Sequence, residues 1–151
     1  MLVLAGFAAA SIAAMGTSGP ARAVNDTSIF GRWFVIDSDS LTRRALVVIA
    51  PNGDEIVGTI AEIYAKPGDD PDPVCAQCPG ADRNRRVRGL PILFVAPRVT
   101  NGDFRGTILD PDEGEIYRCV ITPDPSGRRL TLRGYVGIPL LGRTETWVRA
   151  P

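Results

Sequence analysis

The sequence predicts an all-β protein, a single small barrel of antiparallel strands connected up and down. Short runs of β-branched, aromatic and aliphatic residues recur along the chain after residue 24, which is typical of strands. Gly, Pro, Asn and Asp separate these runs, and these residue types favour tight turns. No part of this region shows a sustained helical period, so one hairpin after another is the simplest arrangement.

Seven segments have the composition of strands, namely 30–36, 45–50, 56–64, 104–109, 115–122, 129–136 and 143–149. Between the second and the third, Asn52-Gly53 predicts a hairpin, because this pair supplies the positive φ angles of a tight primed turn. In segment 129–136 the apolar residues alternate with polar ones. Alternation predicts that Leu132 faces inward, together with Leu130, Gly134 and Val136, and that Arg133 and Tyr135 lie on the other face.

The first 23 residues are expected to be a signal peptide, with the barrel domain spanning residues 24–151. An apolar segment, 1–15, is followed by Ala21-Arg22-Ala23, which has the pattern of a cleavage site. No basic residue precedes the apolar segment, so an uncleaved anchor is the alternative, although the segment is short for a membrane span. We therefore expect a periplasmic or secreted protein without stable membrane insertion.

The charged residues argue against several classes of function. Lys+Arg and Asp+Glu each total 17, so the net charge gives no attraction to nucleic acid. The chain contains no histidine, which removes Ser–His and Cys–His nucleophile pairs and the commonest metal ligand. We therefore expect no cofactor, no metal and no enzymatic activity, with a carboxylate-based hydrolase as the remote alternative.

One connection, residues 65–89, is longer than compact domains usually contain, and it carries Cys75 and Cys78. A loop of this length is usually functional or tied down. Disulfide bonding is the default in an exported protein, and the third cysteine, Cys119, lies in a predicted strand. We favour a Cys75–Cys78 disulfide, and the alternative is that one of the two pairs with Cys119. A zinc site would lack histidine and a fourth thiol.

Two tryptophans occupy the first and last predicted strands, and both strands also carry arginine. Trp33 follows Gly31-Arg32, and Trp147 precedes Arg149 by two residues. A guanidinium stacked on an indole face and bonded to nearby carbonyls would close one end of the barrel. We expect Trp33, Trp147 and Arg149 to have this role, and two unrelated core aromatics are the alternative.

Two apolar segments that contain proline, 89–93 and 137–141, have similar sequences. Proline cannot donate to a central ladder, so both are expected at strand ends or in connections. We expect them to pack on each other and plug the barrel. The alternatives are that they line a ligand mouth, touch a membrane or contact a partner. The acidic segment 110–114 is expected to be a turn rather than a calcium site.

These motifs together resemble a bacterial family, domain of unknown function 2147, whose members are small exported proteins with a lipocalin-like fold. The resemblance rests on residues 31–33, 75–80, 89–93 and 106–111 with Gly114 and Tyr117, and above all on 133–137 followed by 142–147. It implies a lipocalin-like barrel and export. It implies no activity and no catalytic residues.

The leading functional hypothesis is a non-enzymatic binding module that holds a small apolar or amphipathic ligand in the barrel or at its mouth. The candidate ligand contacts are Tyr117, Arg133, Tyr135 and Arg143. The second hypothesis is an envelope module whose exposed apolar loops, such as the one with Leu140, contact a protein partner.

Overall fold

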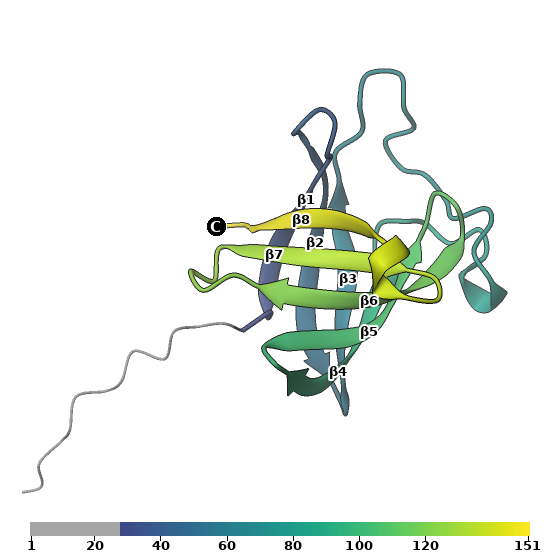
Figure 1. Ribbon diagram of the computed structural model, residues 1–151. Helices are drawn as coiled ribbons and strands as arrows, with labels where there is room; N and C mark the ends of the chain where they lie inside the picture. The colour runs from purple at the N-terminus through teal and green to yellow at the C-terminus, as the bar shows by residue number, and fades with distance from the viewer. Residues whose placement is uncertain (1–27) are drawn as a thin grey trace, which may run out of the picture.

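The computed structural model describes residues 28–151, so the expected signal peptide lies outside the described residues. In the described part of the chain, eight antiparallel strands close into one barrel in chain order, and β1 pairs with β8 (Figure 1). The strands are β1 Gly31–Ile36, β2 Arg43–Asn52, β3 Glu55–Ile63, β4 Pro91–Thr100, β5 Asp103–Asp110, β6 Glu115–Pro123, β7 Arg129–Tyr135 and β8 Arg143–Arg149. The expected all-β, lipocalin-like barrel is therefore confirmed.

The strand that the sequence pattern did not predict is β4. Pro91 is its first residue, where the missing N–H breaks no central ladder. A second proline, Pro97, lies between Val95 and Val99, where the pairing of β4 with β5 shifts register. The two prolines are the reason that the sequence pattern did not indicate a strand here. The strand accommodates one proline at its end and the other at a register irregularity.

The two ends of the barrel differ in the length of their connections. Hairpins β2–β3, β4–β5 and β6–β7 turn at one end through the short segments 53–54, 101–102 and 124–128. The connections at the opposite end comprise residues 37–42, 64–90, 111–114 and 136–142, and all of them except 111–114 are longer than any turn of the first end. In Figure 1 the loop after β3 is the long teal segment that extends well beyond the strands.

Large apolar side chains fill the half of the barrel near the short turns. Trp33 is fully buried there, and its indole Nε1 donates to the Ile29 carbonyl oxygen at 2.8 Å. Other buried residues of this half are Ile49, Ile56, Val95, Ile121 and Leu130. Burial of this kind supplies most of the driving force for folding.

The expected Cys75–Cys78 disulfide is present, and it lies inside the long loop. Both cysteines are buried. The loop also contacts the β5–β6 turn, because Cys75 Sγ lies 3.2 Å from the Pro111 carbonyl oxygen. A Cβ on Gly114 would lie 2.2 Å from the Gln77 carbonyl oxygen, so the two segments meet closely. The disulfide loop therefore forms part of the wall at the long-loop end.

The two apolar segments do not behave alike, so the expectation that they plug the barrel together is wrong. Leu90, Ile92 and Leu93 are buried in the core. By contrast, Leu140 is 80% exposed and Leu141 is 78% exposed. They belong to a single 3-10 turn, η2 (Pro139–Leu141), which stands outside the ladder. The segment leaves the barrel wall at the cavity opening, where Leu141 lines the cavity edge and does not fill the core.

Helical structure in the described residues is limited to η2 and one other 3-10 turn, η1 (Gly80–Asp82). Within residues 28–151, no helix is both long enough and apolar enough to cross a membrane.

Candidate functional site

A cavity of about 910 Å³ occupies the half of the barrel near the long loops and is open to solvent at that end. Small-molecule sites typically have volumes of roughly 300–1,000 Å³, so the cavity can hold a small organic ligand. Its walls come from strands on all sides of the barrel and from the four loops at this end. The barrel is therefore neither open throughout nor filled throughout.

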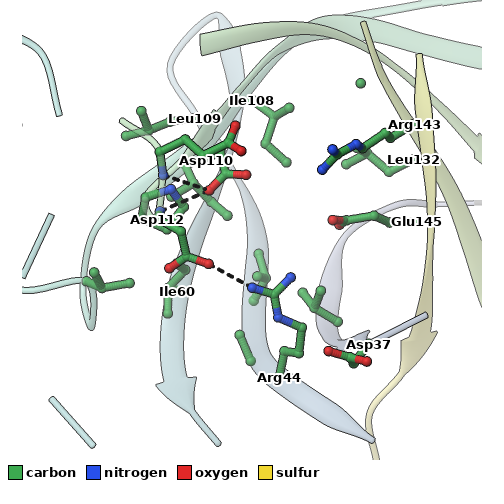
Figure 2. A pocket seen from close by; sticks show the side chains of 18 of the residues that line it. Asp37, Arg44, Ile60, Ile108, Leu109, Asp110, Asp112, Leu132, Arg143 and Glu145 are labelled. Carbon is green, nitrogen blue, oxygen red and sulfur yellow. Dashed lines mark hydrogen bonds and ion pairs between the residues drawn. The ribbon is translucent and has the colours of Figure 1, made fainter. Parts of the chain in front are cut away.

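The lining of the cavity divides into apolar and charged residues. Strand residues that point inward supply most of the apolar lining, which includes Val47, Ile60, Ile108, Leu132 and Trp147. Figure 2 shows Ile60, Ile108 and Leu132 together with some of the charged side chains around the same space, Arg143 and Glu145 among them. The charged residues are Asp37, Arg44, Lys66, Asp69, Asp70, Asp110, Asp112, Glu113, Arg143 and Glu145.

Two ion pairs lie at the rim of the cavity, where one joins the start of β2 to a loop and the other joins two loops. Arg44 Nη2 lies 2.9 Å from Asp112 Oδ2, and Lys66 Nζ lies 3.2 Å from Asp37 Oδ2. The arginine and lysine side chains are about half exposed, 46% and 55%, so each pair contributes little to stability. The pairs instead fix the positions of the loops that surround the opening.

Asp37 is held in its charged form. The pKa of its carboxyl is lowered chiefly by hydrogen bonds from the backbone N–H and the hydroxyl of Ser40, and then by Lys66. The Ser40 N–H and hydroxyl both donate to Asp37 Oδ1, at 2.8 and 2.9 Å. A carboxylate with this environment is a poor proton donor.

The β5–β6 connection is the expected acidic turn. Asp110 Oδ1 accepts the backbone N–H of Asp112 at 2.9 Å, and the Gly114 N–H donates to the Asp110 carbonyl oxygen. Next to it, the Tyr117 hydroxyl donates to Glu113 Oε2 at 2.6 Å. This hydrogen bond to the carboxylate raises the pKa of Tyr117. The tyrosine therefore stays neutral and anchors Glu113 at the rim.

Glu145 on β8 is a cavity residue that the sequence argument did not nominate. Its register partner is the inward-facing Leu132. Its Oε2 accepts the indole N–H of Trp147 at 3.2 Å. Alternation along β8 places residues 143, 145, 147 and 149 on one face. Alternation along β8, which places Glu145 on the same face as Trp147 and Arg149, therefore identifies it from the sequence.

Three of the four nominated contacts, Tyr117, Tyr135 and Arg143, line the cavity. Tyr135 does so although alternation had placed it on the outer face, because β7 ends at this residue beside the opening. Arg133 is not among the lining residues. Its guanidinium binds the β7–β8 loop instead, through the carbonyl oxygens of Pro139 and Leu140.

At the filled end, the Arg149 guanidinium carbon lies 4.2 Å from the centre of the Trp33 ring. It also donates to the carbonyl oxygens of Gly127, Phe30 and Ser28, at 2.6, 2.9 and 2.8 Å. Gly31 adopts a φ of 120°, and a Cβ there would lie 3.0 Å from the guanidinium. Trp147, which was expected at this end, instead lines the cavity.

Residues 28–151 give little support for a metal site or for a reactive thiol. No group of three or more His, Cys, Asp or Glu side chains there is arranged to hold a metal ion. Cys119 is the free cysteine of this region, and it is buried. Burial raises the pKa of its thiol to about 12, so it is a poor nucleophile at neutral pH. Carboxylates, by contrast, do line the cavity.

A family model described as an uncharacterized protein conserved in bacteria, DUF2147, matches residues 31–149. The chain belongs to this family. Among solved structures, it is similar to HP1028 from Helicobacter pylori, which is described as belonging to the lipocalin family. The TM-score is 0.67 at 16% identity, and the match covers 82% of this chain and 84% of that one. No curated protein matches the chain. At this identity the structural likeness shows the fold and no more.

Proposed function

We propose that this member of the DUF2147 family is an exported binding module that holds a small amphipathic ligand in the open half of its barrel. The observation that carries the proposal is the cavity of about 910 Å³ at one end of the barrel. Eight-stranded barrels of this size are able to hold one small ligand. The filled end supplies a rigid base for such a site.

The lining indicates how a ligand would lie. Its apolar part would contact inward-facing residues such as Ile60, Ile108 and Leu132, while its polar end would meet the charged rim. Each buried methylene contributes about 0.8 kcal/mol. An apolar tail of eight carbons would thus contribute about 6 kcal/mol before the costs of association are subtracted.

Export is part of the proposal, and the buried Cys75–Cys78 disulfide supports it. Disulfides form and persist in oxidising compartments such as the periplasm. The apolar segment and the cleavage pattern in residues 1–23 give independent support from the sequence.

Native mass spectrometry of the protein isolated from the periplasm of the cells that make it tests both parts. We expect a chain that begins at Val24 and carries an additional small-molecule mass. In a Gly134→Leu variant this mass should be lost. A Cβ at residue 134 would lie 3.7 Å from Tyr117 Cβ and 3.9 Å from Ile108 Cγ2, both in the cavity lining. The leucine side chain would therefore occupy ligand space.

Thr131→Leu is the matched control, because Thr131 is an exposed residue of the same strand. This variant should retain the ligand mass. A wild-type protein without any bound mass, or a Gly134→Leu variant that retains it, would contradict the binding proposal. A chain found in the cytoplasm with residues 1–23 intact would contradict the export proposal.

Binding of a protein partner is a second candidate function, favoured by the apolar lip, Val136, Ile138, Leu140 and Leu141. All four side chains are more than half exposed. Arg133 fixes the lip through its bonds to Pro139 and Leu140 and a 2.6 Å bond to Thr144 Oγ1. A rigid, exposed apolar segment is typical of an interaction surface.

Changing Leu140 and Leu141 to serine separates this function from a structural role. Because both side chains are exposed, the melting temperature should stay within about 2 °C of the wild type. Crosslinking from residue 140 in cells should yield one defined protein adduct, and the double variant should lose it. A clear fall in melting temperature would show that the lip packs in the fold, and the absence of any adduct would count against a partner.

A further inference from the structure

We propose that the ligand is an amphipathic cation, such as an alkylamine, whose positive charge binds Glu145 while its apolar part occupies the cavity. This inference deepens the proposed function and depends on it. Its basis is the imbalance of charge around the cavity, together with the position of Glu145 inside the barrel wall.

Acidic groups dominate the cavity lining. Among the described residues that line it, seven carry carboxylates and three carry basic groups. Two of the basic groups, Arg44 and Lys66, are already paired with Asp112 and Asp37. Five carboxylates and one guanidinium then remain. A cleft lined by one sign of charge within low-dielectric walls concentrates counter-ions of the opposite sign.

Glu145 is the carboxylate best placed to contact a ligand inside the barrel. It comes from β8 rather than from a loop, and it pairs in register with Leu132. Its partner in the structure is the Trp147 indole N–H, which is neutral. No ion pair within residues 28–151 involves Glu145. A cation entering the cavity would therefore give Glu145 an ion pair that none of the described residues supplies.

Arg143 is the residue that argues for the opposite ligand. It lies two positions before Glu145 on the same face of β8, and it points into the same space in Figure 2. An anionic amphiphile would be attracted to its guanidinium but would also meet Asp110 and Glu145 around that space. Because carboxylates outnumber basic groups in the lining, we expect the cavity to bind a cationic ligand more tightly than an anionic one. Arg143 reduces the affinity for the cation.

Calorimetric titration with three ten-carbon probes tests the inference. Decylamine is protonated at neutral pH, decanol is neutral and decanoate is anionic, while the apolar chain stays the same. We expect decylamine to bind about tenfold more tightly than decanol, and decanoate to bind most weakly. Raising the salt concentration should weaken decylamine binding more than decanol binding.

Glu145→Gln is the decisive variant, because glutamine keeps the shape and can still accept the Trp147 N–H. It should weaken decylamine binding about tenfold and change decanol binding by less than about twofold. Arg143→Gln should strengthen decylamine binding. Glu115→Gln is the matched control, since Glu115 is exposed on β6 and is not among the lining residues; it should leave all three affinities unchanged.

The outcomes distinguish the two proposals. If decanol or decanoate binds at least as tightly as decylamine, or if Glu145→Gln leaves decylamine binding unchanged, the cation inference is overturned while ligand binding stands. If none of the three probes binds the wild-type chain, the proposed function fails as well.

Discussion

Replacing Arg149 by alanine is expected to lower the free energy of unfolding by about 3 kcal/mol, because it removes the contacts that close the filled end of the barrel. The guanidinium stacks on Trp33 and donates hydrogen bonds to three carbonyl oxygens. Two of these oxygens belong to residues just before β1, and the third belongs to the β6–β7 turn. Hydrogen bonds from a charged donor contribute about 1.5–3 kcal/mol each, although their effects do not add fully. Thermal unfolding should show a melting temperature lower by about 10 °C.

Arg105→Ala is the control for this measurement. Arg105 is an exposed residue of β5, and its loss should change the free energy of unfolding by less than about 0.5 kcal/mol. Arg149→Lys should fall between the two, because an ammonium group cannot stack and bond to three carbonyls in one plane. Equal stability of Arg149→Ala and Arg105→Ala would show that the closure contributes nothing to the fold.

Gly106→Ala is expected to be the most damaging small substitution in the barrel wall, also at about 3 kcal/mol. A Cβ at this position would lie 1.9 Å from the Phe94 carbonyl oxygen and 2.7 Å from Val95 Cα. Both atoms belong to the backbone of the neighbouring strand, so β4 and β5 would have to separate. Chemical denaturation should show a lower midpoint at an unchanged slope.

Gly134→Ala is the matched control, because Gly134 lies in the same cross-strand row, Gly106–Cys119–Gly134. A Cβ added at residue 134 would lie 3.7 and 3.9 Å from its nearest neighbours, which are ordinary van der Waals distances. The alanine variant at 134 should be as stable as the wild type or slightly more stable. If both glycine variants unfold at the same denaturant concentration, the close approach of β4 and β5 is not present in solution.

Much of the fold was predictable because local patterns and the global arrangement agree. Alternating apolar residues and strong turn sequences determine strands such as β7 and the β2–β3 hairpin. Strand β4 was not predicted because Pro91 and Pro97 argue against a strand. The register irregularity that accommodates Pro97 cannot be seen in the sequence. The 3-10 turn at Leu140 was likewise hidden, since apolar composition alone does not tell whether a segment packs inside or protrudes.

The site was predictable only in the parts that belong to strands. Tyr117 and Arg143, which the sequence nominated, lie on strands, and Glu145 was available from alternation along β8. The rim residues Asp37 and Lys66 were not, because loops 29 residues apart in the sequence meet only after the barrel closes. The volume of the cavity depends on which side chains fill the interior, and no local pattern contains that information.

The central claim is that the open half of the barrel holds a small amphipathic ligand, and a crystal structure of the protein isolated from its own cells tests it most directly. We predict continuous, elongated electron density between Ile108 and Leu132, with its polar end beside Glu145. A cavity that contains only ordered water, or one closed by inward movement of the long loops, would contradict the account.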